Sequence, residues 1–210
     1  MDSEPTQWEK IFRQDGRVFP EPRPRVVRFT ELLLELGLHT VLDLGCGTGR
    51  HVIHMAAKGL RVSGSDNAPT ALKLTRQWLE EAGLTADLVL SDMRQPLPFK
   101  DNSFDALLSA QVIHHALLAT VLDTAREIER VVRRDGLILV SVPTRKAISE
   151  DAPEHEEIEP NTFVPKSGTE AGLPHHLFTP ERFQRIFPRF KVMDLQVYDD
   201  RVMVLQGIRG

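Results

Sequence analysis

The sequence of 210 residues contains one cysteine, one tyrosine and two tryptophans. A single cysteine, Cys46, excludes an intramolecular disulfide, so the fold depends on a packed core. Hydrophobic residues make up 41% of the chain and charged residues 27%, which is ordinary for a globular protein. The length suits one domain with a complete core.

The sequence also lacks a large excess of one charge and any long apolar run. Lys and Arg total 26 against 30 Asp and Glu, which gives a formal net charge of −4. Proteins that bind nucleic acid usually carry a basic surface, so this balance disfavours a nucleic-acid substrate. No apolar run approaches the length of a membrane helix, and residues 1–5 do not resemble a signal peptide. We therefore expect a cytoplasmic protein without membrane contact.

Short aliphatic runs alternate with helical patterns through the middle of the chain. The runs are residues 41–44, 61–65, 87–90, 104–108 and 137–142. Nearly continuous apolar character is typical of parallel strands that are covered on both faces. Between the runs, apolar residues recur at helical spacing, as in the stripe from Leu118 to Val132, which we expect to end at Asp135-Gly136. This alternation predicts a doubly wound α/β sheet.

The two ends of the chain depart from this alternation. Trp8 and Phe12 are spaced as on one helical face, and a helix is expected over residues 24–37. Residues 145–176 have no regular period, and loops of that length in a compact domain are usually functional. We predict an ordered cap there, over the substrate pocket. The expected parts are an N-terminal lid and helix (1–37), a cofactor-binding core (38–144), a substrate-capping loop (145–178) and a C-terminal helix and hairpin (179–210).

The clearest chemical signature is the run Asp-Leu-Gly-Cys-Gly-Thr-Gly from Asp43 to Gly49. Glycine in a turn from a strand into a helix permits positive φ and a close approach of the backbone to a ligand. The helix N-terminus that follows attracts anionic or polar groups. The spacing differs from that of dinucleotide dehydrogenases because residue 50 is Arg, and no P-loop lysine follows. A tight structural turn is the alternative explanation.

Two carboxylates follow at the ends of the next two predicted strands. Asp66 is placed to accept the hydroxyls of a ribose, although it or Asn67 can instead cap the helix that begins near Pro69. Asp92 is placed to accept an adenine amino group while Met93 covers the ring, with a surface turn as the alternative. Open α/β sheets bind ligands where strand carboxyl ends meet, so the three elements together indicate a cofactor site.

These motifs resemble those of class I S-adenosylmethionine (SAM)-dependent methyltransferases. Residues 41–49 are similar to the first motif of that family, and residues 97–105 resemble the Leu-Pro-Phe-x-Asp-x-Ser-Phe-Asp run before its fourth strand. Residues 127–137 resemble its next helix and turn, although 134–136 depart from the usual Pro-Gly-Gly. The resemblance covers residues 38–144 and extends loosely to the C-terminus. It implies a Rossmann-like sheet of seven strands in the order 3-2-1-4-5-7-6, with the last strand antiparallel and helices on both faces.

The resemblance also implies SAM as cofactor, with S-adenosylhomocysteine as product, and assigns residues to it. The methionine moiety falls to Asp43 and the glycine loop, the ribose to Asp66, and the adenine to Asp92. The aromatic lid of Trp8 and Phe12 is expected to close over the cofactor. The cofactor-binding residues that the resemblance implies are Asp43, Gly45, Cys46, Gly47, Thr48, Gly49, Asp66, Asn67, Asp92, Met93, Ser109, Ala110 and Gln111.

Two histidine pairs, His114-His115 and His175-His176, are the candidates for catalysis on the substrate side. A histidine can take a proton from the substrate nucleophile because its pKa is near neutrality. Packing within the cap is the alternative. Their spacing is not that of a metal-ligand set, so no metal is expected. A group of uncharacterised bacterial and archaeal methyltransferases has similar segments, which does not define a substrate.

The sequence therefore predicts an enzyme that transfers the SAM methyl group to a small-molecule acceptor by in-line displacement. A SAM-binding regulatory subunit without catalysis is one alternative. A tRNA methyltransferase is another, because residues 109–115 faintly resemble the wobble-uridine enzymes, but the acidic balance opposes it. A nucleotide-dependent oxidoreductase is disfavoured by the glycine spacing. His51 and His54 are interpreted as surface residues, and the oligomeric state stays open.

Overall fold

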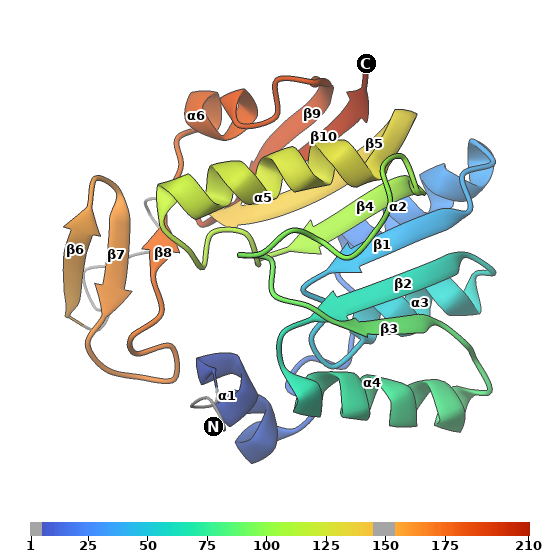
Figure 1. Cartoon of the computed structure of the whole chain (residues 1–210), viewed down its shortest axis with the longest axis horizontal. Helices are drawn as coiled ribbons and strands as arrows, with labels where there is room; N and C mark the ends of the chain where they lie inside the picture. Colours follow the sequence, from blue (N-terminus) through green and yellow to red (C-terminus); the bar gives the residue numbers. More distant parts are fainter. Residues whose placement is uncertain (1–5, 145–153) are drawn as a thin grey trace.

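The computed structural model describes residues 6–144 and 154–210. A seven-stranded sheet with the order β3-β2-β1-β4-β5-β10-β9 forms its centre (Figure 1). The first five strands run parallel, and β10 lies antiparallel between β5 and β9. If these seven strands are numbered 1 to 7 along the chain, β9 is strand 6 and β10 is strand 7. The order is then the expected 3-2-1-4-5-7-6, so the predicted topology is confirmed. The strands are β1 (Thr40–Leu44), β2 (Arg61–Asp66), β3 (Asp87–Leu90), β4 (Phe104–Ala110), β5 (Val132–Pro143), β9 (Phe190–Tyr198) and β10 (Val202–Arg209).

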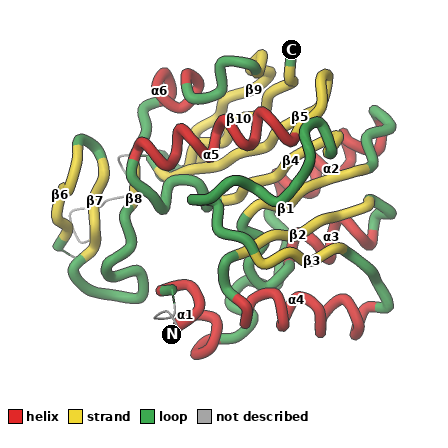
Figure 2. The backbone as a smooth tube through the Cα atoms, viewed as in Figure 1, coloured by secondary structure: helices red, strands yellow, loops and turns green. Residues whose placement is uncertain are grey.

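Helices cover both faces of this sheet (Figure 2). α2, α3 and α4 pack on one face, and α5 and α6 pack on the other, whereas α1 lies at the edge. No helix among the described residues is long and apolar enough to cross a membrane. The helices are α1 (Gln7–Asp15), α2 (Pro24–Glu35), α3 (Arg50–Ala57), α4 (Pro69–Ala82), α5 (Leu118–Val131) and α6 (Pro180–Arg185).

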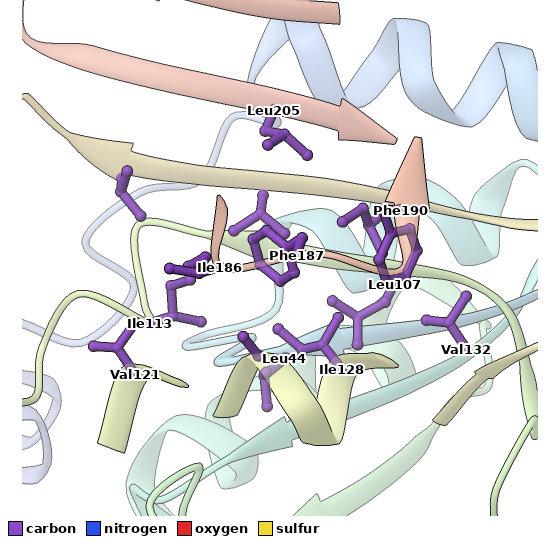
Figure 3. Close-up of a cluster of buried hydrophobic side chains, with 14 of the residues drawn as sticks. Leu44, Leu107, Ile113, Val121, Ile128, Val132, Ile186, Phe187, Phe190 and Leu205 are labelled. Carbon is purple, nitrogen blue, oxygen red and sulfur yellow. The ribbon is translucent and has the colours of Figure 1, made fainter. Parts of the chain in front are cut away.

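The strand runs are apolar on both faces because each face has its own core. In β1, Val41 contributes to the core under α2, α3 and α4, while Leu42 and Leu44 contribute to the core under α5 and α6. Figure 3 shows this second core, in which Leu44 from β1 lies close to Ile128 from α5. Successive strand residues point to opposite faces, which explains why alternate residues supply the two cores.

Two local expectations are corrected by the structure. α5 ends at Val131 and β5 starts at Val132, so Asp135 and Gly136 lie within the strand rather than ending the helix. Gly136 is required there because a Cβ would lie 2.7 Å from the Asp105 carbonyl oxygen. The helical spacing of Ala71, Leu74, Trp78 and Ala82 predicts that they form the core-facing stripe of α4. Trp78 is only partly buried, however, and the Arg17 guanidinium lies 5.1 Å from its ring centroid.

The segment expected to form the capping loop contains a small sheet of its own. β6 (His155–Glu159), β7 (Thr162–Pro165) and β8 (His175–His176) pair in that order, at the same edge of the molecule as α1 (Figure 1). Glu159 connects this sheet to the core, because its carboxylate accepts a hydrogen bond of 2.6 Å from the Leu118 backbone N–H at the start of α5. The first part of the expected cap, residues 145–153, lies outside the described residues.

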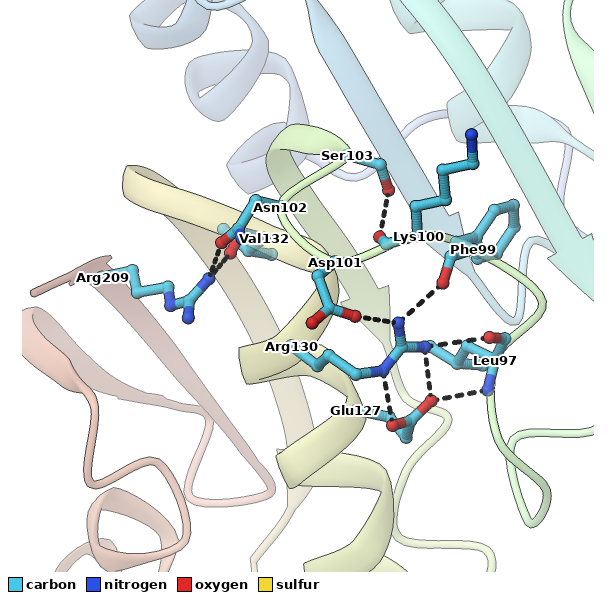
Figure 4. A network of polar contacts seen from close by, with 10 residues as sticks. All are labelled: Leu97, Phe99, Lys100, Asp101, Asn102, Ser103, Glu127, Arg130, Val132 and Arg209. Atoms are coloured by element: carbon cyan, nitrogen blue, oxygen red, sulfur yellow. Dashed lines mark hydrogen bonds and ion pairs between the residues drawn. The ribbon is translucent and has the colours of Figure 1, made fainter.

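The Leu-Pro-Phe-x-Asp-x-Ser-Phe-Asp run is held by an arginine of α5. The Arg130 guanidinium donates to the carbonyl oxygens of Leu97 and Phe99 and to the carboxylates of Asp101 and Glu127 (Figure 4). The Glu127 carboxylate in turn accepts from the Leu97 backbone N–H at 2.7 Å. This network lies before β4, so the run shapes the entry to that strand.

Asp105, the last residue of the run, joins the start of three strands. Its carboxylate accepts hydrogen bonds from the backbone N–H groups of His39 and Thr40, both at 2.8 Å, and from Arg133 Nε at 2.6 Å. Burial acts to raise the pKa of Asp105, but these hydrogen bonds outweigh it and hold the pKa well below its usual range. The ionised carboxylate therefore stabilises the folded state.

We expect Asp105→Asn to lower the free energy of unfolding at pH 7 by about 2–3 kcal/mol, because hydrogen bonds to a charged acceptor weaken. A depressed folded-state pKa contributes stability that is present above about pH 4 and is lost as pH falls further. The difference between wild type and variant should therefore narrow on acidification, which urea unfolding at pH 7 and pH 3.5 measures. Asp101→Asn, at a more exposed carboxylate, is the control. An equal loss in both variants, or a loss independent of pH, contradicts this assignment.

Candidate functional site

The glycine loop leaves β1 in a conformation that only glycine adopts easily. Gly45, Gly47 and Gly49 have φ values of 73°, 54° and 90°, all in the left-handed region. A Cβ on Gly45 would lie 2.4 Å from Val112 Cγ2, and one on Gly49 would lie 2.5 Å from Thr75 Cγ2. The loop is thus packed closely on both sides, and α3 begins directly after it.

Asp66, at the end of β2, braces this loop. Its carboxylate accepts hydrogen bonds from the backbone N–H groups of Gly47, at 2.8 Å, and Ala68, at 2.9 Å. The N-cap residue of α4 is Ala68, so Asp66 is not the helix cap that was considered as the alternative. Burial raises the pKa of Asp66, and the hydrogen bonds from Ala68 and Gly47 act against that rise. Its role toward a ribose stays a prediction.

A cavity of about 1040 Å³ opens at the carboxyl ends of the strands. Its wall combines the glycine loop, the ends of β2 and β3, the segment after β4, α1 and the cap. Of the residues expected in the site, it is lined by Trp8, Phe12, Gly45, Cys46, Gly47, Thr48, Asp66, Asn67, Asp92, Met93, Ala110, Gln111, His114, His115 and His175. The elements that the sequence assigned to cofactor, lid and substrate therefore meet around one space.

Four of the expected residues do not line the cavity: Asp43, Gly49, Ser109 and His176. Asp43 is fully enclosed behind the loop, where burial raises its pKa to about 7 and Arg50 acts in the opposite direction. His176 is buried and its Nδ1 lies 2.7 Å from the Thr162 hydroxyl of the neighbouring strand. His175 and His176 are successive strand residues, so only one of them can face the cavity.

Several polar atoms along the cavity have no partner among the described residues. Gln111 Nε2 and Ser91 Oγ are buried without a hydrogen bond. Gln111 also has a φ of 64°, which is strained for a residue with a side chain, and its backbone N–H is held by the Ser141 carbonyl oxygen at 3.0 Å. Buried polar groups are normally paired, so these atoms indicate a wall prepared for a polar ligand such as SAM.

Asp92 lines the cavity at the end of β3 but already has a partner. Its carboxylate is bound by the Arg94 guanidinium, with Nε 2.9 Å from both of its oxygens. Burial acts to raise the pKa of Asp92, and the hydrogen bonds from Arg94 lower it below its usual value. The carboxylate is therefore ionised near neutral pH, and its role toward an adenine stays a prediction.

α1 closes one side of the cavity. The rings of Trp8 and Phe12 stack with centroids 5.6 Å apart, and Phe12 lies against Gly47. The buried Glu9 carboxylate fixes the helix, because it accepts hydrogen bonds from the Thr70 N–H and hydroxyl at the start of α4. Trp8 and Phe12 thus share one helical face, as their spacing predicted, and Phe12 lies over the glycine loop; closure over a cofactor stays a prediction.

Three histidines form another part of the wall, and His115 lies beside α1, with its ring centroid 5.4 Å from that of Trp8. The ring centroids of His114 and His115 are 3.9 Å apart, and those of His115 and His175 are 4.7 Å apart. Burial lowers the pKa of His115 to about 3 and that of His175 to about 4, and it lowers the pKa of His114 strongly as well. The near-neutral pKa expected of these side chains is therefore wrong: all three rings are neutral at pH 7 and are weaker bases than an ordinary histidine.

Two arginines beside the glycine loop, Arg23 and Arg50, were not expected in the site from the sequence. Arg23 and Arg50 line the cavity, and the Arg50 guanidinium lies 5.0 Å from the ring centroid of Phe19. His51 also lines it and is almost fully buried, so its interpretation as a surface residue is wrong. The Arg23 backbone N–H donates to His51 Nε2 at 3.4 Å, which places the segment before α2 over α3. Arg50 follows the glycine loop directly, and this adjacency could have identified it as a residue of the site from the sequence.

Comparison with known proteins agrees with this geometry. A family model described as "Methyltransferase domain" matches residues 42–140. A ubiquinone biosynthesis O-methyltransferase from Methylocella silvestris is 31% identical over 105 residues, which cover 50% of this chain and 40% of that protein. The 18S rRNA (guanine-N(7))-methyltransferase of Schizosaccharomyces pombe is 35% identical over 92 residues, covering 44% of this chain and 33% of that protein. The chain thus matches less than half the length of these relatives.

A solved structure extends the similarity to the whole fold. The crystal structure of a SAM-dependent methyltransferase from Clostridium acetobutylicum superimposes with a TM-score of 0.71 at 13% identity, covering 97% of this chain and 96% of that one. At that identity the likeness concerns the fold alone. The sequence match thus places residues 42–140 in the methyltransferase domain family, and the strand order with the structural likeness identifies the fold of the whole chain as that of SAM-dependent methyltransferases.

Proposed function

We propose that this protein transfers the methyl group of SAM to a small-molecule acceptor held between the glycine loop and the cap. The observation that carries the proposal is that one cavity is lined by the glycine loop, Asp66 and Asp92 and also by three neutral histidines. Bound SAM supplies an activated methyl group on a sulfonium. The protein's part is to align the acceptor with that group and to exclude water.

The residues have separate roles in this proposal. The glycine loop and Gln111 hold the methionine part of the cofactor, Asp66 the ribose, and Asp92 with Met93 the adenine. Trp8 and Phe12 cover the loop and offer aromatic faces that attract a cationic sulfonium. The methyl acceptor occupies the part of the cavity beside His114, His115 and His175.

A small acceptor is favoured by the way in which the cavity is covered. Gln7 Nε2 of α1 donates to the Thr169 carbonyl oxygen of the cap at 2.8 Å, so the two covering segments touch each other. This contact bridges part of the cavity opening, which suits a compact molecule better than a polynucleotide. The net charge of −4 also disfavours a polynucleotide, because it repels the phosphate backbone. The relatives do not decide between a small-molecule acceptor and a polynucleotide, because one relative is named for ubiquinone biosynthesis and another for rRNA.

The cofactor assignment predicts that S-adenosylhomocysteine binds and that NAD does not. Isothermal titration calorimetry with each ligand measures this directly. Tight binding of NAD with no signal for S-adenosylhomocysteine would refute the assignment. Activity is then tested with SAM labelled in the methyl group, incubated with a small-metabolite fraction and with an RNA fraction of a cell extract. Label that transfers only to RNA overturns the small-molecule acceptor, and binding without transfer to either fraction favours a regulatory subunit.

A further inference from the structure

Three histidines from two distant segments form a cluster in the acceptor part of the cavity. His114 and His115 lie between β4 and α5, whereas His175 comes from β8 of the cap. One ring nitrogen from each lies within 4.8 Å of the other two. The cap is fastened at this point, because the His176 backbone N–H donates to the His114 carbonyl oxygen at 2.8 Å. The juxtaposition therefore follows from the docking of the cap.

The cluster leaves hydrogen-bonding groups unpaired. Among the described residues, His114 Nδ1, His115 Nδ1 and His175 Nε2 are buried and have no hydrogen-bond partner. An unpaired buried polar atom destabilises a fold, and three together would be costly in an ordinary wall. Apolar side chains would fill the same space without that cost. The arrangement is therefore better explained by a ligand that binds all three nitrogens.

We propose that His114, His115 and His175 bind a divalent transition-metal ion, with zinc as the best match, and that the acceptor completes its coordination through an oxygen atom. Imidazole nitrogen is a preferred ligand of zinc, copper, iron and nickel. Three protein ligands with an open position are typical of catalytic zinc sites. In a tetrahedral site with Zn–N bonds of about 2.0–2.1 Å the nitrogens lie roughly 3.4 Å apart, so the rings need only small rotations to close on the ion.

Neighbouring groups suit this assignment. The Glu170 carboxylate lies 3.5 Å from His175 Nε2 and lines the same cavity. The backbone carbonyl oxygen of Pro174 accepts a hydrogen bond from the His115 ring. A backbone carbonyl on the second ring nitrogen of a metal-binding histidine orients the ring, whereas the Glu170 carboxylate, beside the ligating nitrogen itself, adds negative charge near the ion. The cationic residues Arg23 and Arg50 belong to the other wall, beside the glycine loop.

The inference rests on the proposed function and deepens it by naming an acceptor class, a hydroxyl-bearing molecule. Coordination lowers the pKa of a bound hydroxyl, so its proton leaves to solvent without a strong protein base. The oxygen lone pair then forms the O–CH₃ bond while the S–CH₃ bond breaks. The electron pair of the broken bond stays on sulfur, which gives neutral S-adenosylhomocysteine.

Cobalt(II) absorption tests this site without any need for turnover. We expect Co²⁺ added to chelator-treated protein to give a visible ligand-field band, and Zn²⁺ to abolish it by displacement. His115→Ala and His175→Gln should each weaken Co²⁺ binding by about 100-fold, because each removes a direct ligand. His54→Ala, on α3 and outside the cavity, is the control for binding by other histidines and should leave the titration unchanged. Circular dichroism verifies that the variants fold.

Titration of the same samples with S-adenosylhomocysteine separates this inference from the proposed function. Absence of a cobalt band in folded wild-type protein overturns the metal site, even if S-adenosylhomocysteine binds. Equal binding of Co²⁺ by wild type, His115→Ala and His175→Gln overturns it as well. A cobalt band that depends on His115 and His175, in protein that does not bind S-adenosylhomocysteine, supports the metal site and refutes the cofactor assignment instead.

Discussion

Replacement of Gly45 by alanine is expected to weaken S-adenosylhomocysteine binding by at least about 100-fold, because displacement of a binding loop by about 1 Å has effects of that size. Two costs combine at this residue. A φ of 73° is strained for any residue with a Cβ, by about 1 kcal/mol. The added Cβ would also lie 2.4 Å from Val112 Cγ2, and the branched valine side chain has little freedom to move away.

Two controls separate these costs. Gly59 has a φ of 86° but nothing within 4 Å of an added Cβ, so Gly59→Ala introduces the strain without the contact. It should lower the melting temperature slightly and leave cofactor affinity unchanged. The double variant Gly45→Ala/Val112→Ala removes the contact and should recover part of the affinity, measured against Val112→Ala alone. Wild-type affinity in Gly45→Ala would show that the close packing of the loop does not matter for binding.

Replacement of Asp66 by alanine is expected to weaken cofactor binding by tenfold or more while the fold survives. Charge-assisted hydrogen bonds contribute about 1.5–3 kcal/mol each. The structure places Asp66 against the backbone N–H groups of Gly47 and Ala68, and the proposed function adds the ribose hydroxyls. The variant therefore loses a brace for the loop and a direct contact to the ligand at once.

A cofactor analogue distinguishes the brace from the direct contact. S-adenosylhomocysteine that lacks the ribose 2′ and 3′ hydroxyls should bind wild type weakly. Asp66→Ala should lower the affinity for this analogue much less than it lowers the affinity for S-adenosylhomocysteine itself. Such non-additivity in a cycle of variant and analogue measures the interaction itself. Equal losses for both ligands would leave Asp66 as a loop brace only. Unchanged affinity in Asp66→Ala would contradict both roles.

The features that the sequence predicted correctly are those set by short stretches of chain. Parallel strands covered on both sides are apolar throughout, and the runs from 41–44 to 137–142 show this. The glycine loop was recognisable because left-handed φ values require glycine. The N-cap of α6 is equally local, since the Thr179 hydroxyl accepts from the Arg182 backbone N–H three residues later. In each case the physical cause lies within a few residues.

The arrangement of the acceptor side was decided by tertiary structure, because its contacts join segments that are remote in the chain. His114 and His175 meet only when the cap docks on the loop after β4, and strand geometry then turns His176 away from the cavity. His51 is buried because the segment before α2 lies over α3. No local pattern encodes such contacts, so the sequence by itself determined the glycine loop and the strands, and only the family resemblance implied their order. Long-range packing brought the three histidines and their unpaired nitrogens together.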